Sequence, residues 1–236
     1  MSGKPTIARV ALAEQVTSLL QERILDRFYQ PGERLNIDAL SRELEVSSSP
    51  IREALTRLSA MGFVIATSFS GFSVTPVPSR EWFEQLLEYR ILAEGWAASQ
   101  LARRRTPEAI ARMTDSLNAM QGERLGRHAR DYMPANRADE AFHETMLDNC
   151  GNEILAQSVR NLRPHLHHAR LFSKMPQNIA PVIQEHRAIL NAVMAGDEVG
   201  ASAALQSHLR ASWQRYDGWV ADETDGCSNT NLRIDK

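Results

Sequence analysis

One stretch, from Asn36 to Leu58, constrains the fold more than any other part of the chain. Its apolar residues repeat at helical spacing in two short runs, which predicts two helices joined by a tight turn at residues 45–48. Asn36 can cap the first helix. Ser49 can cap the second, and Pro50 suits the first helical position because a missing N–H group costs nothing there. The residues expected to face inward are Ile37, Leu40, Leu44, Ile51, Ala54, Leu55 and Leu58.

Polar side chains remain at the exposed start of the second helix, where Ser47, Ser48 and Ser49 are followed by Arg52 and then Thr56. Hydroxyl groups and an arginine in this position can enter the major groove of DNA and bind base edges. The same pattern also fits an ordinary helical hairpin with a solvated face. Taken alone, this stretch leaves both interpretations open.

The flanking segments extend the hairpin into a larger predicted domain, residues 1–75. Apolar residues at helical spacing predict a helix from about Arg9 to Phe28, and the proline and glycine of Tyr29–Gly32 end it in a turn. Two β-prone runs, 63–66 and 72–75, lie on either side of residues 67–71 and predict a hairpin. Three helices followed by a small β-hairpin indicate a winged helix-turn-helix.

Composition limits the classes of protein to consider. The chain has 236 residues, of which 43% are hydrophobic, and this is enough for folded cores. No apolar run approaches the ~20 residues that a membrane helix needs, and no secretion signal is evident, so a cytoplasmic protein is expected. Cys150 and Cys227 lie far apart and form no metal-binding pair. Residues 1–78 carry eight basic and eight acidic side chains, so DNA binding would depend on local clustering and on two copies acting together.

A second domain is predicted after the extended linker Pro76–Pro78. Residues 79–221 carry helical periodicity without strand-like runs, which predicts an all-α helical bundle and makes the chain mainly α. The tail, residues 222–236, is polar and is expected to be disordered. The predicted helices are 80–105, 107–121, 134–149, 152–173 with a kink at Pro164, 181–195 and 198–220.

One carboxylate and three histidines form a candidate metal site in this bundle. Asp139 and His143 are four residues apart, so they share one face of a helix at a spacing that suits a shared ion. His186 and His208 each lie among apolar residues in later helices. Such a set suits Zn²⁺, Ni²⁺ or another divalent transition metal better than Ca²⁺ or Mg²⁺. Each histidine could instead be a hydrogen-bonded core residue. Three more histidines, His165, His167 and His168, spread around one helix and are interpreted as surface or pocket-lining residues.

Arg90 and Glu94 lie one turn apart on the first helix of the bundle. They can form a simple ion pair. Alternatively, the arginine can anchor a carboxylate ligand near the metal, because its planar guanidinium group binds such anions through two hydrogen bonds.

Two sets of motifs resemble a known family of regulators. QPGERL, the serine-rich turn, PIREALTRLSAMGFV and GFSV resemble the GntR-type winged-helix domain. YRILAEGWAA, DEAFHETMLDNCGNEIL, EHRAILNAVMAGD and the later His208 resemble the FCD-type ligand-binding domain of the FadR-like branch. The resemblance covers residues 10–220 and implies a dimeric bacterial transcription regulator whose helical domain holds a divalent metal and a small organic acid.

The resemblance assigns roles to individual residues. It places metal ligands at Asp139, His143, His186 and His208, and carboxylate binding at Arg90. Glu94, one turn further along the helix, is expected at the effector together with Arg90. Ser48 stands where family members usually carry an arginine, and Ser70 before Gly71 replaces a basic residue in the wing. The residues expected at the DNA are Arg34, Ser47, Ser48, Ser49, Arg52 and Gly71.

The sequence therefore predicts a homodimeric, metabolite-responsive regulator, acting as a repressor on double-stranded operator DNA. A metalloenzyme with an Asp/His₃ site, either a hydrolase or an oxygenase, is the main alternative, although no catalytic base or nucleophile is evident near the ligands. A structural or adaptor module is a third reading, which gives the buried histidines no purpose.

Overall fold

The computed structural model describes residues 7–67, 71–121, 126, 128–172 and 178–227. The chain divides into two compact units at Val77 and Pro78, within the predicted linker. Each unit has its own core. No helix among the described residues is long and apolar enough to cross a membrane.

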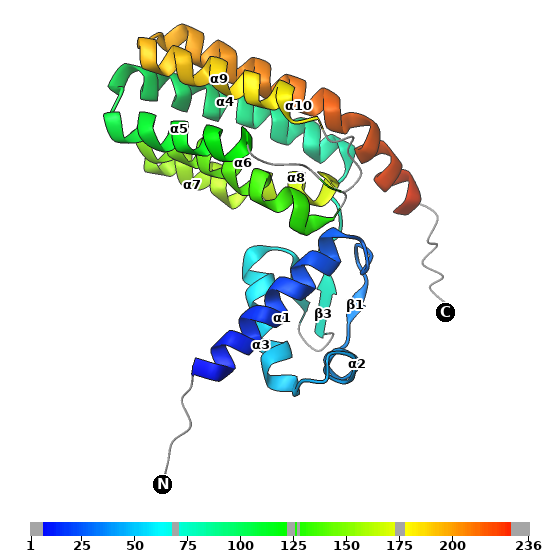
Figure 1. Ribbon diagram of the computed structural model, residues 1–236. Helices are drawn as coiled ribbons and strands as arrows, with labels where there is room; N and C mark the ends of the chain where they lie inside the picture. Colours follow the sequence, from blue (N-terminus) through cyan, green and yellow to red (C-terminus); the bar gives the residue numbers. More distant parts are fainter. Residues whose placement is uncertain (1–6, 68–70, 122–125, 127, 173–177, 228–236) are drawn as a thin grey trace. The chain divides into compact units, whose positions relative to one another are not determined.

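Unit 1 is a winged helix-turn-helix. It contains helices α1 (Ile7–Leu25), α2 (Ile37–Glu43) and α3 (Ser48–Met61), and strands β1 (Arg34–Leu35), β2 (Val64–Thr67) and β3 (Gly71–Val74). Helix α1 packs on α3, and the central strand β3 pairs antiparallel with both β1 and β2 (Figure 1). Its core includes Leu20, Ile51, Leu55 and Leu58, all fully buried.

The helical hairpin from Asn36 to Leu58 forms as predicted, with one shift at its second helix. The Asn36 side chain accepts a hydrogen bond from Ala39 N at 2.9 Å and so caps α2. Helix α3, however, begins at Ser48 and its N-cap is Ser47, so the predicted cap at Ser49 is wrong. Pro50 is tolerated at the third position because the first amides of a helix have no acceptor within it.

Strand β1 was not predicted. It is only two residues long, too short to show the alternation that identifies a strand, and it exists because β3 offers a pairing edge: Arg34 lies opposite Ser73 and Leu35 opposite Phe72. The small sheet therefore has three strands where a two-stranded hairpin was expected.

Unit 2 is an all-α bundle of seven helices within the described residues. They are α4 (Arg80–Arg104), α5 (Pro107–Gln121), α6 (Ala129–Asn149), α7 (Glu153–Asn161), α8 (Pro164–Phe172), α9 (Ala180–Ala195) and α10 (Glu198–Cys227). Helix α10 packs along α4 and α9, and α5 packs on α6 and α9 (Figure 1). The main core includes Leu101, Met113, Phe142, Ile189 and Leu205.

Local capping signals explain where several of these helices begin and end. The Ser79 hydroxyl accepts from Trp82 N at 3.2 Å, and Asn152 accepts from Leu155 N at 3.1 Å. Gly196 ends α9 with a φ of +72°, a conformation that costs glycine little, and Asp197 then accepts from Gly200 N at 2.8 Å.

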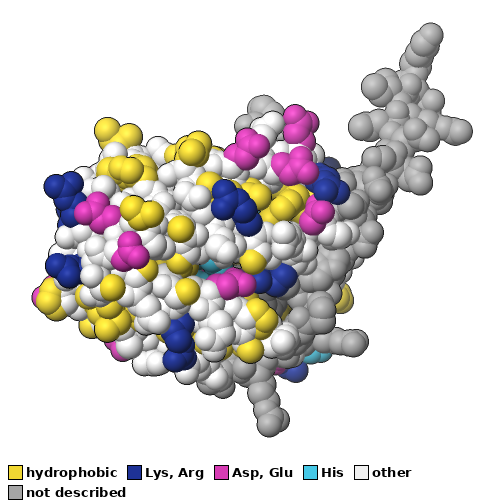
Figure 2. Space-filling view, turned by 90° about the horizontal axis from the view of Figure 1, so that it is seen from above, with side chains coloured by type: hydrophobic (Ala, Val, Ile, Leu, Met, Phe, Trp, Pro, Cys, Tyr) yellow, Lys and Arg dark blue, Asp and Glu magenta, His cyan; other side chains and the backbone are white. Residues whose placement is uncertain are grey.

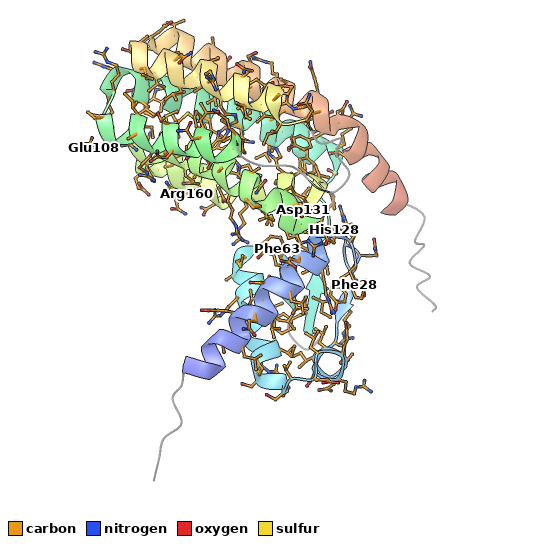
Figure 3. All side chains as sticks on the ribbon, in the orientation of Figure 1. Phe28, Phe63, Glu108, His128, Asp131 and Arg160 are labelled. Carbon is orange, nitrogen blue, oxygen red and sulfur yellow. The ribbon has the colours of Figure 1, made fainter. Side chains whose placement is uncertain are left out.

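Three predicted helix boundaries in this unit are wrong. Helix α6 begins at Ala129 instead of Pro134, because His128 and Asp131, labelled in Figure 3, form a capping box at its start. The predicted helix 152–173 is two helices, because the backbone before Pro164 is pushed out of the helical region and Arg163 adopts a φ of +49°.

Helix α10 continues to Cys227, seven residues beyond its predicted end and into the tail expected to be disordered from residue 222. The added segment contains no proline, so nothing in its backbone interrupts the helical hydrogen bonds. The remainder of that tail, residues 228–236, lies outside the described residues.

Candidate metal and effector site

Four side chains from three helices meet inside unit 2. Asp139 and His143 lie one turn apart on α6, His186 lies on α9 and His208 on α10. One ligand atom from each lies within 4.8 Å of those of the other three. The histidines are 1%, 0% and 4% exposed, and little histidine surface is visible on the face shown in Figure 2. The fold thus brings together all four side chains singled out as candidate ligands.

The hydrogen bonds of the three rings fix which nitrogen faces the site. Nδ1 of His143 lies 2.7 Å from Glu94 Oε2, Nδ1 of His208 lies 2.8 Å from Glu185 Oε2, and Nδ1 of His186 lies 2.8 Å from the Val182 carbonyl. Carboxylates and carbonyls only accept hydrogen bonds, so each Nδ1 carries a proton and donates it. In each neutral ring the lone pair then lies on Nε2, the arrangement that second-shell partners impose on metal-binding histidines.

Two of these Nε2 atoms lack a partner. Those of His143 and His186 are buried without a hydrogen bond among the described residues. Nε2 of His186 lies 3.0 Å from Asp139 Oδ1, so a nitrogen and a carboxylate oxygen that can both bind a cation meet there. Buried polar atoms are normally satisfied, and a cation placed between these acceptors would satisfy them. The donor set and the orphaned nitrogens therefore fit a divalent transition metal.

Two arginine–glutamate ion pairs support two of the histidines, because the glutamate of each pair contacts one ring. Glu94 accepts from Arg90 Nε at 2.5 Å as well as from His143. Glu185 accepts hydrogen bonds from both terminal nitrogens of Arg215 at 2.8 Å, in addition to the one from His208. Two of the three rings are thus each held by a carboxylate that an arginine holds in turn.

These contacts keep the carboxylates charged. Burial alone would raise the pKa of Glu94, but the charge of Arg90, followed by that of His143, outweighs it and holds the pKa well below its usual range. For Glu185, hydrogen bonds from His208 and Arg215 outweigh burial and lower the pKa to about 2. Burial would also raise the pKa of Asp139. Hydrogen bonds, the largest of them from His165, outweigh burial and hold the pKa of Asp139 well below its usual range.

Burial acts on the histidines in the other direction. It lowers the pKa of His143 to about 4 against the pull of Glu94. It lowers the pKa of His208 to about 3, where His186 adds to the effect. Both rings are therefore neutral near pH 7, which is the form that can bind a metal.

Two side chains that hold the ligands in place, Glu185 and His165, were not predicted from the sequence. Glu185 directly precedes His186, but its contacts reach residues on α10, and no local pattern reveals such contacts. His165 is 6% exposed, and its Nδ1 lies 3.2 Å from Asp139 Oδ2. The three histidines of α8 point to different partners, as expected: His167 packs edge-on against Trp82, and His168 stacks on Tyr216.

Arg90 and Glu94, expected at the effector, form a buried ion pair, and they are 3% and 1% exposed. Both oxygens of Glu94 already accept hydrogen bonds. Arg90 uses Nε and Nη2 for Glu94, and no partner of its Nη1 is found in the described part of the chain. Effector binding by this pair stays a prediction.

The six residues expected at the DNA are all exposed on unit 1. Arg52 lies on α3 without an ion pair in the described part of the chain, whereas Arg57, further along the helix, pairs with Glu53 at 2.8 Å and Glu14 at 3.6 Å. Ser47 makes no side-chain capping bond, so its hydroxyl is available to other groups. Arg34 lies on β1, Ser48 and Ser49 open α3, and Gly71 opens β3 with a φ of +82°.

Comparison with known proteins extends over both units. Residues 12–74 match the model of the bacterial regulatory proteins of the gntR family, and residues 85–211 match the FCD domain. The chain is 32% identical over 202 residues to the HTH-type transcriptional regulator LutR of Bacillus subtilis, which covers 76% of this chain and 90% of LutR. It is 30% identical over 183 residues to the Nta operon transcriptional regulator of Aminobacter aminovorans, covering 77% and 85%.

The fold also matches a solved structure, that of E. coli McbR/YncC, with a TM-score of 0.61 and 21% identity over 90% of this chain and 98% of that chain. These matches are to transcription regulators, and they fit the winged helix and the all-α bundle described above. The chain therefore belongs to the GntR family of bacterial regulatory proteins, in its FadR-like branch, and is a DNA-binding transcriptional regulator with an FCD ligand-binding domain rather than an enzyme.

Proposed function

We propose that this chain is a homodimeric repressor whose FCD domain binds a divalent transition metal, zinc or nickel, together with a small carboxylate metabolite. The observation that carries the metal proposal is the meeting of Asp139, His143, His186 and His208, because one ligand atom of each lies within 4.8 Å of those of the other three. The Nε2 atoms of His143 and His186 are also buried without a hydrogen bond among the described residues. Asp139, His143, His186 and His208 would hold the ion, which would offer an open position to an oxygen of the effector.

The charges around the site favour an anionic effector. Glu94 pairs with Arg90 and Glu185 with Arg215, whereas Asp139 contacts histidines only in the contacts that the structure gives, so these five charged side chains leave one negative charge when the histidines are neutral. A divalent ion turns this into one positive charge. Because an uncompensated buried charge is costly, one carboxylate would complete the site.

Arg90 is the proposed anchor of that carboxylate, through the Nη1 group that Glu94 does not use. Glu94 would contribute by fixing Arg90 and His143, since both of its oxygens are already engaged. The effector would then contact the metal and Arg90 together.

DNA binding is assigned to α3 and the wing, through Arg34, Ser47, Ser48, Ser49, Arg52 and Gly71. Two winged helices of a dimer would occupy two major-groove half-sites related by two-fold symmetry. The effector would change operator affinity by binding unequally to two arrangements of the DNA-binding units, with the Pro76–Pro78 linker as the segment that changes.

Operator binding at controlled metal and ligand concentrations tests this proposal. A duplex selected in vitro from a random pool would be titrated by fluorescence anisotropy with metal-loaded and chelator-treated protein, in the presence of a panel of small carboxylates. We expect at least one carboxylate to change affinity by about 5-fold or more with metal-loaded protein only. Identical curves in all conditions would contradict the proposed regulation.

A further inference from the structure

His165 lies beside the candidate metal ligands without being one of them. It comes from α8, which supplies none of the four ligands. Its ring is 6% exposed, and its centroid lies 5.1 Å from that of His143. A buried imidazole at this position needs a hydrogen-bond partner, and it has one in Asp139.

The two oxygens of Asp139 have different neighbours. Oδ2 lies 3.2 Å from His165 Nδ1, whereas Oδ1 lies 3.0 Å from His186 Nε2. A carboxylate oxygen accepts hydrogen bonds, so His165 Nδ1 is the donor in this contact. His165 is the neighbour of Oδ2, and His186 is the neighbour of Oδ1. The bond from His165 therefore decides which oxygen is turned toward the three histidines.

Each of the other ligands also has its own supporting group. Glu94 of α4 holds His143, Glu185 of α9 holds His208, and the Val182 carbonyl holds His186. These groups lie on α4 and α9, while the support for Asp139 comes from α8. Supporting contacts of this kind orient metal ligands, and removing one costs about 10–100-fold in affinity.

We propose that His165 is a positioning residue for the metal site: it donates from Nδ1 to Asp139 Oδ2 and keeps Oδ1 directed at the Nε2 atoms. This inference rests on the proposed function, since it requires that the four ligands bind a metal. Helix α8 would then support metal binding, because its residue His165 orients the ligand Asp139.

Metal affinities of three variants test the role of His165. The full-length protein would be stripped of metal and titrated with Zn²⁺ against a chromophoric chelator, and with Co²⁺ while its visible absorption spectrum is recorded. His165→Ala should weaken Zn²⁺ binding about 10–100-fold and change the Co²⁺ spectrum. His165→Asn keeps a side-chain N–H donor and should recover most of the affinity and the wild-type spectrum.

His167→Ala is the matched control. This residue lies two positions further along α8 and packs on Trp82 and Phe83 instead of Asp139, so its variant should bind Zn²⁺ like the wild type. Thermal unfolding of each metal-free variant shows whether the fold is kept. A loss in His167→Ala equal to that in His165→Ala would mean that damage to α8, and not the hydrogen bond, lowers affinity, and the inference would be wrong.

The remaining outcomes separate this inference from the proposed function. Wild-type affinity in His165→Ala would overturn the positioning role and leave the metal site intact. Equal losses in His165→Ala and His165→Asn would also overturn it, because a side-chain N–H donor at this position would then not restore affinity. A wild-type protein that binds neither ion would overturn both the inference and the proposed metal site.

Discussion

Glu185 shows how much of the site depends on contacts between helices. It precedes His186 on α9, yet its hydrogen bonds go to His208 and Arg215 on α10. The Asp139–His143 pair follows from sequence, because four-residue spacing fixes two groups on one helical face. His186 and His208 were candidates because each lies among apolar residues, the family resemblance placed both at ligand positions, and the structure brings their nitrogens close together. Glu185 and His165 could not be predicted, because which side chains meet across helices depends on how the bundle packs.

Replacing Glu185 tests this second layer of the site. Glu185→Ala leaves Nδ1 of His208 without its acceptor, so we expect Zn²⁺ affinity to fall about 10–100-fold in a chelator competition. Glu140→Ala is the control, because Glu140 is an exposed neighbour of Asp139 on α6. Unchanged affinity in Glu185→Ala would show that the contact does not support the ligand.

At the scale of single elements, features set by neighbouring residues were easier to predict than features set by contacts between elements. The cap at Asn36 was predicted correctly, because a cap is decided within one turn of helix. Strand β1 was missed because only its pairing with β3 makes it a strand. A kink was expected at Pro164, but the helix is broken there into α7 and α8. The reason is that the backbone of Arg163 has a positive φ, which a continuous right-handed helix cannot contain.

Helix α3 offers a direct test of the assignment to DNA. Arg52 is exposed and unpaired in the described part of the chain, so Arg52→Ala should weaken operator binding by about 1–3 kcal/mol. Arg57→Ala is the control on the same helix, because Arg57 is already engaged with Glu53 and Glu14. Anisotropy titrations at several salt concentrations measure both. Equal affinities for Arg52→Ala and the wild type would place the reading surface elsewhere.

Helix α8 should make stability depend on pH through His167. Burial, followed by the charges of Arg170 and Arg163, lowers the pKa of His167 to about 4 in the folded protein. The unfolded chain has a pKa near 6.5, so it binds more protons between these values, and stability falls as the pH falls from about 6.5 toward 4.

The effect of His167 can be isolated with one variant. His167→Leu removes the titrating group, so between pH 7 and pH 5 the wild type should lose about 1–2 kcal/mol more unfolding free energy than the variant. Urea unfolding at both pH values measures the difference. Parallel losses in the two proteins would show that His167 is not the group responsible.

At the scale of the whole molecule, the proposed regulation of an operator with two half-sites requires a dimer. Leu92 and Trp96 lie one turn apart on α4 and are 74% and 40% exposed. Large apolar side chains grouped on a surface favour association, and a two-fold interface uses the same surface on both subunits. The α4 face is therefore the surface we assign to subunit contact.

A charge introduced on this face should separate the subunits. We expect Leu92→Glu to shift the protein toward the monomer in light scattering after size exclusion, while Ile154→Glu leaves the mass unchanged. Ile154 is a suitable control because it is 81% exposed but lies on α7. If Leu92→Glu keeps the wild-type mass, the subunit contact does not involve this face.

The metal content of the purified full-length protein tests the central proposal most directly. Elemental analysis after expression without added chelator should find about one zinc or nickel ion per chain in the wild type, and His186→Ala should have lost most of it. A wild-type protein without stoichiometric metal, or a His186→Ala variant that holds as much metal as the wild type, would contradict a site built from Asp139, His143, His186 and His208.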